Sequence, residues 1–310
     1  MSRLHEALEK ARHQQSGGAP ELPDVEEIIA TGASSPEGAK SADAAPDAGP
    51  AEMLEANAGS GSILTHCTQQ DWSLNTNNMV FLSDETNAVS QELFRTLRSR
   101  LYQIRGTSSL EVIVVCSAIP GEGKTFVSAN LAHAFAQQSD RRALVIDADI
   151  RRAGGLSTLL GAPSAPGLTD YLLGEQSAEN IVQTGPLENL YLIPCGKRVA
   201  TPGELICNSK FVTLIEQLRP AFDWIIIDTP PVLPISDARA IADLSDGVLM
   251  VVSARSTLAH LAKRGVREFR RDSLLGVVLN RMAEPPSAYY SEYGYGYGQG
   301  EPTEEAIKVC

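Results

Sequence analysis

Short apolar runs that alternate with helical patterns are the feature that most constrains this fold. Beyond residue 110, six runs rich in β-branched residues recur, at residues 112–116, 143–146, 190–193, 224–227, 248–252 and 275–279. They are apolar at nearly every position, as strands covered on both faces require. Helical patterns occupy the intervening residues 123–138, 204–218 and 257–270. The alternation predicts an α/β fold with a doubly wound parallel sheet.

The N-terminal part of the chain has a different composition. Residues 16–62 contain nine acidic side chains and one basic side chain, Lys40, so they hold −8 of the net charge of −12. They contain no aromatic residue and bury too little apolar surface to offset their ordering entropy. We therefore predict an acidic Ala/Gly/Pro-rich disordered linker over 16–85. A short amphipathic helix is predicted before it, over 1–15. A folded domain over 86–284 and a Tyr-rich flexible tail over 285–310 are predicted after it.

Charge, hydropathy and cysteine content exclude several classes of protein. Without the linker the net charge is −4, which gives no electrostatic basis for binding nucleic acid. The longest apolar runs, 112–119 and 247–254, are far shorter than the ~20 residues of a membrane helix. Residues 1–15 lack the apolar stretch of a secretory signal. Five cysteines without a C-x-x-C pair fit reduced thiols. The sequence therefore predicts a cytoplasmic protein with no zinc site.

A glycine-rich loop follows the first predicted strand and opens the first long helix. The segment from Ala118 to Thr125, AIPGEGKT, matches the phosphate-loop pattern G-x-x-x-x-G-K-[ST] except at its first position. Its glycines let backbone amides approach phosphate oxygens, Lys124 reaches the β and γ phosphates, and the Thr125 hydroxyl suits Mg²⁺. A chance glycine-rich turn is the alternative, which G-K-T at a strand-to-helix junction disfavours. The predicted nucleotide-binding residues here are Pro120, Gly121, Glu122, Gly123, Lys124, Thr125 and Phe126.

Acidic residues end two strands that we expect beside the first. Asp147 and Asp149 end the run from Ala143, and Asp228 ends the run from Trp224. Because the carboxyl ends of parallel strands form one crevice, all three carboxylates are expected to converge on the phosphate loop. Any one of them alone is more often a strand-end cap or a surface charge. Together with Lys124 and Thr125 they predict a nucleotide and magnesium site.

These motifs resemble those of the bacterial tyrosine kinases, phosphate-loop autokinases of capsule and exopolysaccharide export, over residues 92–297. Residues 120–125 resemble the family's Walker A motif, residues 145–151 its additional acidic motif, and residues 225–228 its Walker B motif. The resemblance implies a phosphate-loop fold of the deviant Walker, or septum-positioning ATPase, superfamily. It also implies that the folded domain is an ATP- and Mg²⁺-dependent protein-tyrosine kinase.

Two further segments extend the resemblance. Glu92, Arg95 and Arg98 match the E-x-x-R-x-x-R pattern that the family uses for self-assembly, although a solvated helix face looks much the same. A tyrosine cluster lies near the C-terminus, where the family carries its autophosphorylated tyrosines. The predicted phosphoacceptors are Tyr289, Tyr290, Tyr293, Tyr295 and Tyr297. A low-complexity Gly/Tyr tail is the alternative.

The needs of phosphoryl transfer assign roles to single residues, and the resemblance adds one for Asn280. Lys124 is expected to neutralise the transferred phosphoryl group, and Thr125, Asp149 and Asp228 to hold the metal or its waters. Asp147 is the candidate to accept or orient the tyrosine proton, and its role is exchangeable with that of Asp149. Arg151 is a charge clamp or an ordinary exposed arginine. Asn280 contacts the adenine or simply ends a strand.

Partners follow from the same resemblance. The N-terminal helix, long linker and lack of membrane spans look most like the cytoplasmic kinases of exosortase-linked operons. The family needs a membrane-embedded activator of the polysaccharide co-polymerase, or chain-length, type. We expect it to be a separate protein that holds this chain at the inner membrane. A homo-oligomer through Glu92, Arg95 and Arg98 is also expected.

Two other functions stay open. A septum-positioning or partition ATPase would hydrolyse ATP without labelling tyrosines. That group carries a signature lysine early in Walker A, where this chain has Ile119 followed by Pro120. A non-catalytic interaction module would bind nucleotide weakly and use the tail as a contact. The complete set of Lys124, Thr125, Asp149 and Asp228 counts against it.

Overall fold

The computed structural model describes residues 63–82, 88–152 and 154–282. The predicted helix over 1–15, the linker as far as residue 62 and the tyrosine tail over 285–310 lie outside these residues. Where the chain is described, no helix is both long and apolar enough to cross a bilayer.

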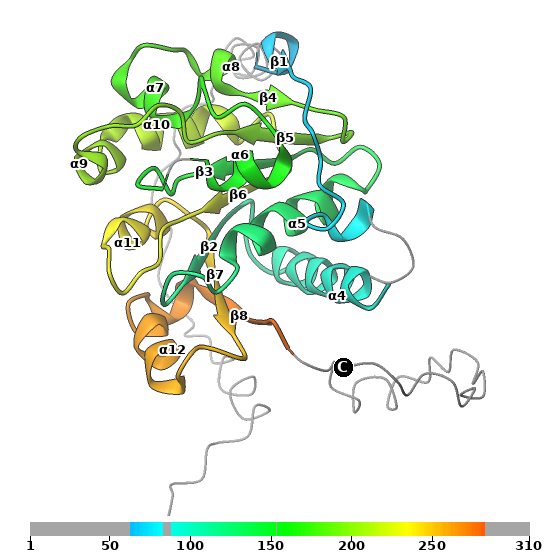
Figure 1. The fold of residues 1–310 in the computed structure, drawn as a ribbon, viewed down its shortest axis with the longest axis vertical. Helices are drawn as coiled ribbons and strands as arrows, with labels where there is room; N and C mark the ends of the chain where they lie inside the picture. The colour runs from blue at the N-terminus through cyan, green and yellow to red at the C-terminus, as the bar shows by residue number, and fades with distance from the viewer. Residues whose placement is uncertain (1–62, 83–87, 153, 283–310) are drawn as a thin grey trace, which may run out of the picture. The chain divides into compact units, whose positions relative to one another are not determined.

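A twisted, mostly parallel sheet organises the described residues (Figure 1). Its eight strands are β1 (Thr68–Gln69), β2 (Val112–Ser117), β3 (Ala143–Asp147), β4 (Gln183–Thr184), β5 (Leu190–Ile193), β6 (Trp224–Asp228), β7 (Gly247–Ser253) and β8 (Leu274–Asn280). Their order is β1-β4-β5-β3-β6-β2-β7-β8, and every pair is parallel except β4 with β5. All six predicted runs are strands, and the doubly wound α/β prediction is confirmed.

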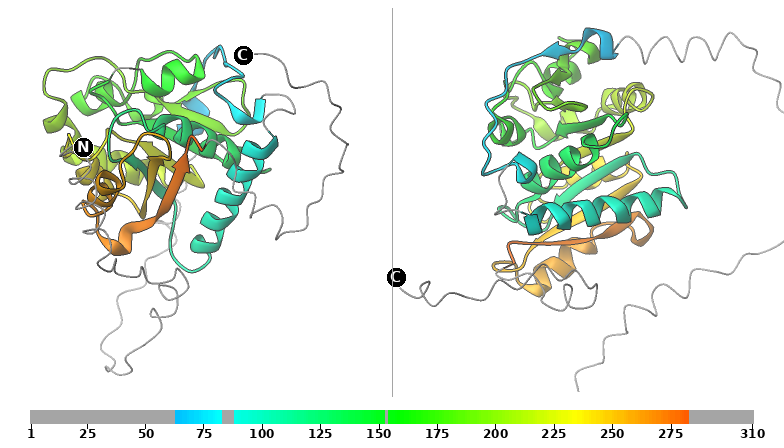
Figure 2. Two further views of the ribbon diagram at one scale, coloured as in Figure 1. Left: turned by 60° about the horizontal axis from the view of Figure 1, so that its bottom comes forward. Right: turned by 90° about the vertical axis from the view of Figure 1, so that its right-hand side faces the viewer.

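Helices cover both faces of this sheet (Figure 2). On one face lie α4 (Ala88–Arg105), α5 (Lys124–Ala136) and α6 (Gly155–Leu160). The other face is covered by α7 (Leu168–Leu173), α8 (Ala178–Ile181), α9 (Pro202–Ile206), α10 (Ser209–Leu218), α11 (Asp237–Ala242) and α12 (Ala259–Val266). The described residues also contain two short 3₁₀ turns, η1 (Val80–Leu82) and η3 (Arg271–Ser273). Strands β2, β3, β6 and β7 are therefore buried at every residue.

One predicted helix divides into two. The pattern over 204–218 predicts a continuous helix, but α9 ends at Ile206 and α10 begins at Ser209. The Asn208 side chain accepts a hydrogen bond from the Lys210 backbone N–H at 3.0 Å and so caps a new helix start. Asparagine favours this N-cap position over a helix interior, which is the physical reason for the break.

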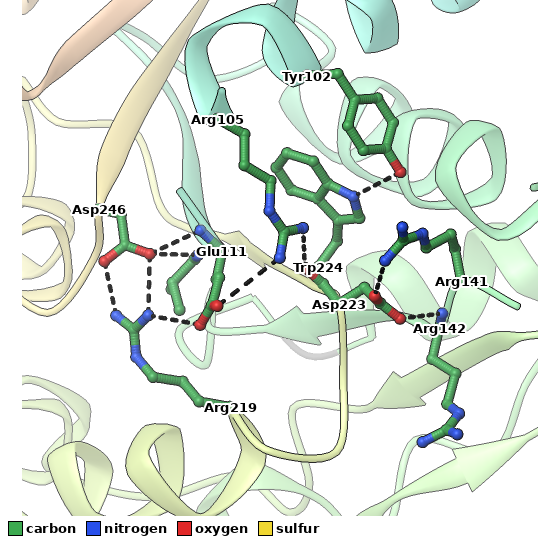
Figure 3. A network of polar contacts seen from close by, with 10 residues as sticks. Tyr102, Arg105, Glu111, Arg141, Arg142, Arg219, Asp223, Trp224 and Asp246 are labelled. Carbon is green, nitrogen blue, oxygen red and sulfur yellow. Dashed lines mark hydrogen bonds and ion pairs between the residues drawn. The ribbon is translucent and has the colours of Figure 1, made fainter. Parts of the chain in front are cut away.

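The amino ends of the central strands are fastened by a network of ion pairs and hydrogen bonds (Figure 3). Arg219 forms a bidentate pair with Asp246, with N–O distances of 2.8 and 3.0 Å. The backbone N–H groups of Glu111 and Val112 donate to the same carboxylate, each at 2.8 Å. Nearby, the Asp223 carboxylate accepts from Arg141 at 2.6 Å. These contacts fix the starts of β2 and β6 at the end of the sheet away from the phosphate loop.

Residues 63–82 belong to the fold, which corrects the predicted linker over 16–85. Strand β1 pairs with β4, and Trp72 and Met79 are buried. Asn130 of α5 accepts from the Val80 backbone N–H at 2.7 Å and donates to the Asn78 carbonyl at 3.0 Å. The segment is mostly polar and has no helical or strand periodicity, so its few widely spaced anchors give no pattern in the sequence.

Candidate active site

The phosphate loop connects β2 to α5, as the sequence predicts. Gly121 and Gly123 have φ angles of 84° and 95°, a region that favours glycine. A Cβ atom on Gly123 would lie 2.0 Å from the Asn280 side-chain nitrogen, so space as well as backbone angle requires glycine there. Helix α5 begins at Lys124. The free N–H groups of its first turn are the donors that an anion needs.

Three aspartates converge on this loop. Strands β3 and β6 pair in a register that sets Asp147 opposite Asp228. The Thr125 hydroxyl donates to Asp228 at 2.7 Å, and the Lys124 ammonium lies 3.1 Å from the Asp149 carboxylate. All three carboxylates and the ammonium are buried. The structure therefore brings the predicted acidic residues and the two loop residues into one cluster.

Ser128 completes the cluster and was missed by sequence reasoning. It lies one turn beyond Lys124 on α5, and its hydroxyl is within hydrogen-bond distance of the Lys124 carbonyl, at 3.0 Å, and of the second oxygen of Asp228, at 3.1 Å. Each oxygen of Asp228 thus has a hydroxyl group within hydrogen-bond distance. The spacing of four residues from Lys124 is the signal that would have found it, since it puts both side chains on one helix face.

One oxygen of Asp147 has no hydrogen-bond partner among the described residues. Its Oδ2 accepts from the Leu156 backbone N–H at 3.0 Å, whereas its Oδ1 is buried and has no hydrogen-bond partner within the described residues. Burial, and then the negative charge of Asp228, raises the pKa of Asp147 to about 7. A carboxyl group that titrates near neutral pH and has an unpartnered oxygen is suited to accept a proton.

The cluster as a whole carries excess negative charge. Burial alone lowers the pKa of Lys124, but the charges of Asp228 and Asp149 outweigh burial and raise it. Burial raises the pKa of Asp228 despite the opposing effect of Lys124 and two hydroxyl donors. Three carboxylates with one lysine leave room for a dication, and their oxygen donors are the type that Mg²⁺ prefers.

The structure also limits how a metal would be held. Among residues 63–82, 88–152 and 154–282, no three His, Cys, Asp or Glu side chains are arranged to hold a metal ion by themselves. Mg²⁺ typically keeps several waters and takes further ligands from substrate phosphates, so this arrangement fits it. Thr125 and Asp228 lie in contact here, and metal binding by Thr125, Asp149 and Asp228 stays a prediction.

A cavity of about 520 Å³ opens beside the phosphate loop. Gly123, Phe126 and Asn280 line it, as does a set that sequence reasoning missed: Asn78, Arg152 and Arg281. The size and the mixture of glycine, amide, aromatic and cationic groups suit a nucleotide. Asn280 lines this cavity, and its contact with the adenine stays a prediction.

Arg151 is engaged elsewhere in the fold. Its guanidinium forms a bidentate pair with Asp237 at the start of α11, at 2.7 and 3.0 Å. This pair raises the pKa of Arg151 further above its usual range. Its predicted role as a charge clamp would require it to exchange this partner for a phosphate.

The predicted self-assembly residues make contacts within α4, to Phe81 of η1 and to α5. Glu92 and Arg95 form an exposed pair at 3.4 Å, and the Arg95 guanidinium lies 5.7 Å from the ring centre of Phe81. Arg98 donates to the Ala134 carbonyl near the end of α5 at 2.6 Å. Arg98 thus stabilises a helix C-terminus, and self-assembly through these residues stays a prediction.

Comparison with known proteins defines the class first. A family model described as an AAA domain matches residues 110–272, which include the phosphate loop and all three aspartates. The chain is also similar to solved kinase domains. It matches the crystal structure of the chimerical protein CapA2B2 with a TM-score of 0.63 and 30% identity, over 68% of this chain and 92% of that one. It matches the kinase domain of Escherichia coli tyrosine kinase ETK with a TM-score of 0.60 and 28% identity, over 66% of this chain and 80% of that one.

Curated relatives define the family. Tyrosine-protein kinase YwqD of Bacillus subtilis is 32% identical over 221 residues, which are 71% of this chain and 91% of YwqD. A putative tyrosine-protein kinase, EpsB of Ralstonia nicotianae, is 36% identical over 213 residues, or 68% of this chain. The match spans only 28% of EpsB, so this chain corresponds to about a quarter of some relatives and to nearly all of others. The chain belongs to the bacterial tyrosine-kinase family.

Proposed function

We propose that this chain is an ATP- and Mg²⁺-dependent protein-tyrosine autokinase that phosphorylates the C-terminal tyrosines of neighbouring copies. The observation that carries the proposal is the cluster of Lys124, Thr125 and three buried aspartates, one of which has an unpartnered oxygen. Phosphoryl transfer needs positioning and charge neutralisation, and this cluster offers both beside a cavity of nucleotide size.

The residues divide the work as follows. Lys124 leaves Asp149 to contact the transferred phosphoryl group, while Thr125, Asp149 and Asp228 hold the metal or its waters. Bound Mg²⁺ supplies charge neutralisation on the phosphates. The tyrosine oxygen forms a bond to the γ-phosphorus as the bond to the ADP oxygen breaks, and the phenolic proton passes to Asp147. The unpartnered Oδ1 of Asp147 favours it over Asp149, which is assigned to the metal or its waters.

The tyrosine cluster is the proposed substrate. Five tyrosines between Tyr289 and Tyr297 are separated by Gly, Ser and Glu, which makes several hydroxyls available to one site. Each transfer adds about −1.5 to −2 charge, so full modification would add roughly −8 to −10. Repulsion between modified tails would then drive copies apart. The predicted tail over 285–310 thereby becomes a switch for assembly through Glu92, Arg95 and Arg98.

The proposed setting is capsule or exopolysaccharide synthesis and export. One relative, ExoP of Rhizobium meliloti, is named a succinoglycan biosynthesis transport protein and is 32% identical over 215 residues. We propose that a separate membrane-embedded protein of the co-polymerase type activates this chain and holds it at the cytoplasmic face of the inner membrane.

Incubation of the purified chain with Mg²⁺ and labelled ATP tests this function. The assay is run with and without a cytoplasmic peptide of a candidate activator, and phosphoamino-acid analysis and phosphate release are measured together. We expect phosphotyrosine from the wild-type chain and none from Lys124→Met or from a variant with phenylalanine at all five tail tyrosines. Lys210→Met is the matched control, because Lys210 is an exposed residue of α10.

The outcomes separate the candidate functions. Phosphotyrosine in the folded Lys124→Met variant would contradict the assigned site. Phosphate release without phosphotyrosine, with activator present, would favour a septum-positioning type of ATPase. Neither activity, together with no nucleotide binding, would favour a non-catalytic interaction module.

A further inference from the structure

Glu122 is an unusual residue within the phosphate loop. Its side chain is only 1% exposed. Its carboxylate accepts from the backbone N–H of Ile119 at 2.8 Å, from the backbone N–H of Ser253 at 3.3 Å, and from the Thr257 hydroxyl. All three donors are uncharged. A buried carboxylate is costly without such donors, and its charge opposes the binding of an anion nearby. We therefore expect this carboxylate to have a function that offsets the cost of its burial and its repulsion of a bound anion.

The backbone of Glu122 is attached to the same region of the fold. Its carbonyl accepts from the Asn280 side-chain amide at 2.9 Å. Asn280 ends β8 and pairs in register with Ser253 at the end of β7. The Asn280 carbonyl in turn accepts from the Ala254 backbone N–H at 2.8 Å. Both the side chain and the main chain of Glu122 are thus bound to the carboxyl ends of β7 and β8.

Helix α12 packs against the beginning of the same loop. A Cβ atom on Gly265 would lie 2.9 Å from the Cβ of Ala118 and 2.4 Å from the Met250 side chain. Thr257 lies two residues before α12 begins. The connection from β7 to α12, residues 254–258, therefore forms an outer support that contacts the phosphate loop through Thr257, while α12 contacts it at Ala118.

We propose that Glu122 is a positioning residue that holds the phosphate loop in its anion-binding shape through Ser253 and Thr257. It acts through the loop backbone, whose N–H groups contact the phosphates, and ATP affinity accordingly depends on the connection between β7 and α12. The proposal rests on the proposed function in one respect, namely that the ligand of the loop is a nucleotide.

The test is calorimetric titration of the full chain with Mg-ATP, which measures affinity without activity. A hydrogen bond to a charged group is worth enough to change an equilibrium about tenfold or more. We expect Glu122→Ala to weaken ATP binding at least about tenfold and Thr257→Val to weaken it about three- to tenfold. Glu122→Gln keeps one acceptor oxygen, but its Nε2–H2 group then faces the backbone N–H of either Ile119 or Ser253, so one anchor of the loop is lost. We expect this variant to weaken ATP binding about three- to tenfold.

Two controls make the result specific. Thr213→Val is the matched substitution, because the Thr213 hydroxyl bonds to the Ser209 carbonyl within α10, and we expect unchanged affinity. The double variant Glu122→Ala/Thr257→Val is expected to bind no more weakly than Glu122→Ala alone, since the two residues share one interaction. Thermal melts confirm that each variant is folded.

Each result has a distinct meaning. Folded Glu122→Ala that binds ATP within twofold of wild type would overturn the proposal, as would equal affinities of Thr257→Val and Thr213→Val. Should Glu122→Ala fail to fold, the ATP affinities of Thr257→Val and Glu122→Gln test the proposal instead. Affinities of both variants within twofold of wild type would overturn it. Absence of ATP binding by the wild-type chain would overturn the proposed function and this inference with it.

Discussion

The two ends of the parallel strands hold charged side chains in opposite ways. At the amino ends, Asp223 and Asp246 each accept from an arginine and from backbone N–H groups (Figure 3). Burial alone raises the pKa of both, yet the hydrogen bonds and arginine charges outweigh burial and lower it. At the carboxyl ends, three aspartates share Lys124, and the pKa of Asp147 and Asp228 is raised.

The difference shows which end serves stability and which serves chemistry. Carboxylates with matched partners stabilise the folded state, whereas a buried cluster with excess negative charge destabilises it. Perturbed pKa values of this kind gather at functional sites, and active sites commonly lower the stability of a fold. The carboxylates at the amino ends thus stabilise the sheet. Those at the carboxyl ends hold excess negative charge, which a cation bound with a nucleotide would neutralise.

Among the substitutions that compare the two ends, Asp147→Asn is expected to have the largest effect, which is on catalysis. Loss of the proton acceptor is expected to lower the rate of phosphotyrosine formation about 10²- to 10⁴-fold. Stability is expected to be unchanged or higher, because the variant removes a buried negative charge beside Asp228. Kinetic labelling and chemical denaturation of the same preparation check both parts. Unchanged labelling would remove Asp147 from the mechanism.

Asp246→Asn is the corresponding change at the amino ends. It breaks the pair with Arg219 and weakens two backbone hydrogen bonds, so we expect a loss of about 1–3 kcal/mol in the free energy of unfolding. Because the Arg219 side chain is 30% exposed, the expected loss in the free energy of unfolding is smaller than for a fully buried ion pair. We expect labelling per folded molecule within about twofold of wild type. A variant that lost labelling but not stability would reverse the comparison.

The pH dependence of the free energy of unfolding also tests the comparison between the two ends of the strands. The folded pKa of Asp147, about 7, is above its unfolded value, so the folded state binds more protons between about pH 4 and 7. The free energy of unfolding of the nucleotide-free chain should therefore fall as pH rises through this window, and Asp147→Asn should flatten that fall. Denaturation at several pH values measures it.

At lower pH, the carboxylates at the amino ends of the strands are expected to change the free energy of unfolding with pH in the opposite direction. The folded pKa of Asp223 and Asp246 is below the unfolded value, so their contribution is complete above the ordinary carboxyl pKa. It is lost as pH falls through the lowered folded pKa. Asp246→Asn should make the chain less sensitive to acid in that range. Equal acid sensitivity of variant and wild type would show that Asp246 contributes little.

The smallest expected effect comes from Ser128→Ala. It removes one of two hydroxyl donors to Asp228 and leaves the donor from Thr125. We expect labelling to fall about three- to tenfold, which corresponds to one hydrogen bond to a charged group. Ser157→Ala is a matched change on α6, and comparison of the two initial rates isolates the contact with Asp228.

Sequence patterns predicted most of the fold because its central strands β2, β3, β6 and β7 are buried on both faces. Apolar runs such as Trp224–Asp228 are specified by burial alone, and their order along the chain fixes the class of fold. Strands β1 and β4 have two residues each and no hydrophobic pattern, so they were not predicted. The anchors Trp72 and Met79 were missed for the same reason.

The site was predictable where chemistry fixes residue type. Lys124, Thr125 and the three aspartates are required by phosphate and metal binding, and strand ends bring them together. The partners of Glu122 and Arg151 were not predictable. Glu122 contacts Thr257, 135 residues further on, and Arg151 contacts Asp237, 86 residues further on, so only the packed fold shows these pairs.

Transfer between copies is the central claim, and mixing two variants tests it most directly. One chain carries Lys124→Met with its tyrosines intact, and the other has an intact site with phenylalanine at all five tail positions. They are incubated together with Mg-ATP and the activator peptide, and the modified tyrosines are mapped by mass spectrometry. We predict phosphate on the tail of the Lys124→Met chain in the mixture and none on either chain alone. An unmodified mixture, under conditions in which the wild-type chain is labelled, would contradict transfer between copies.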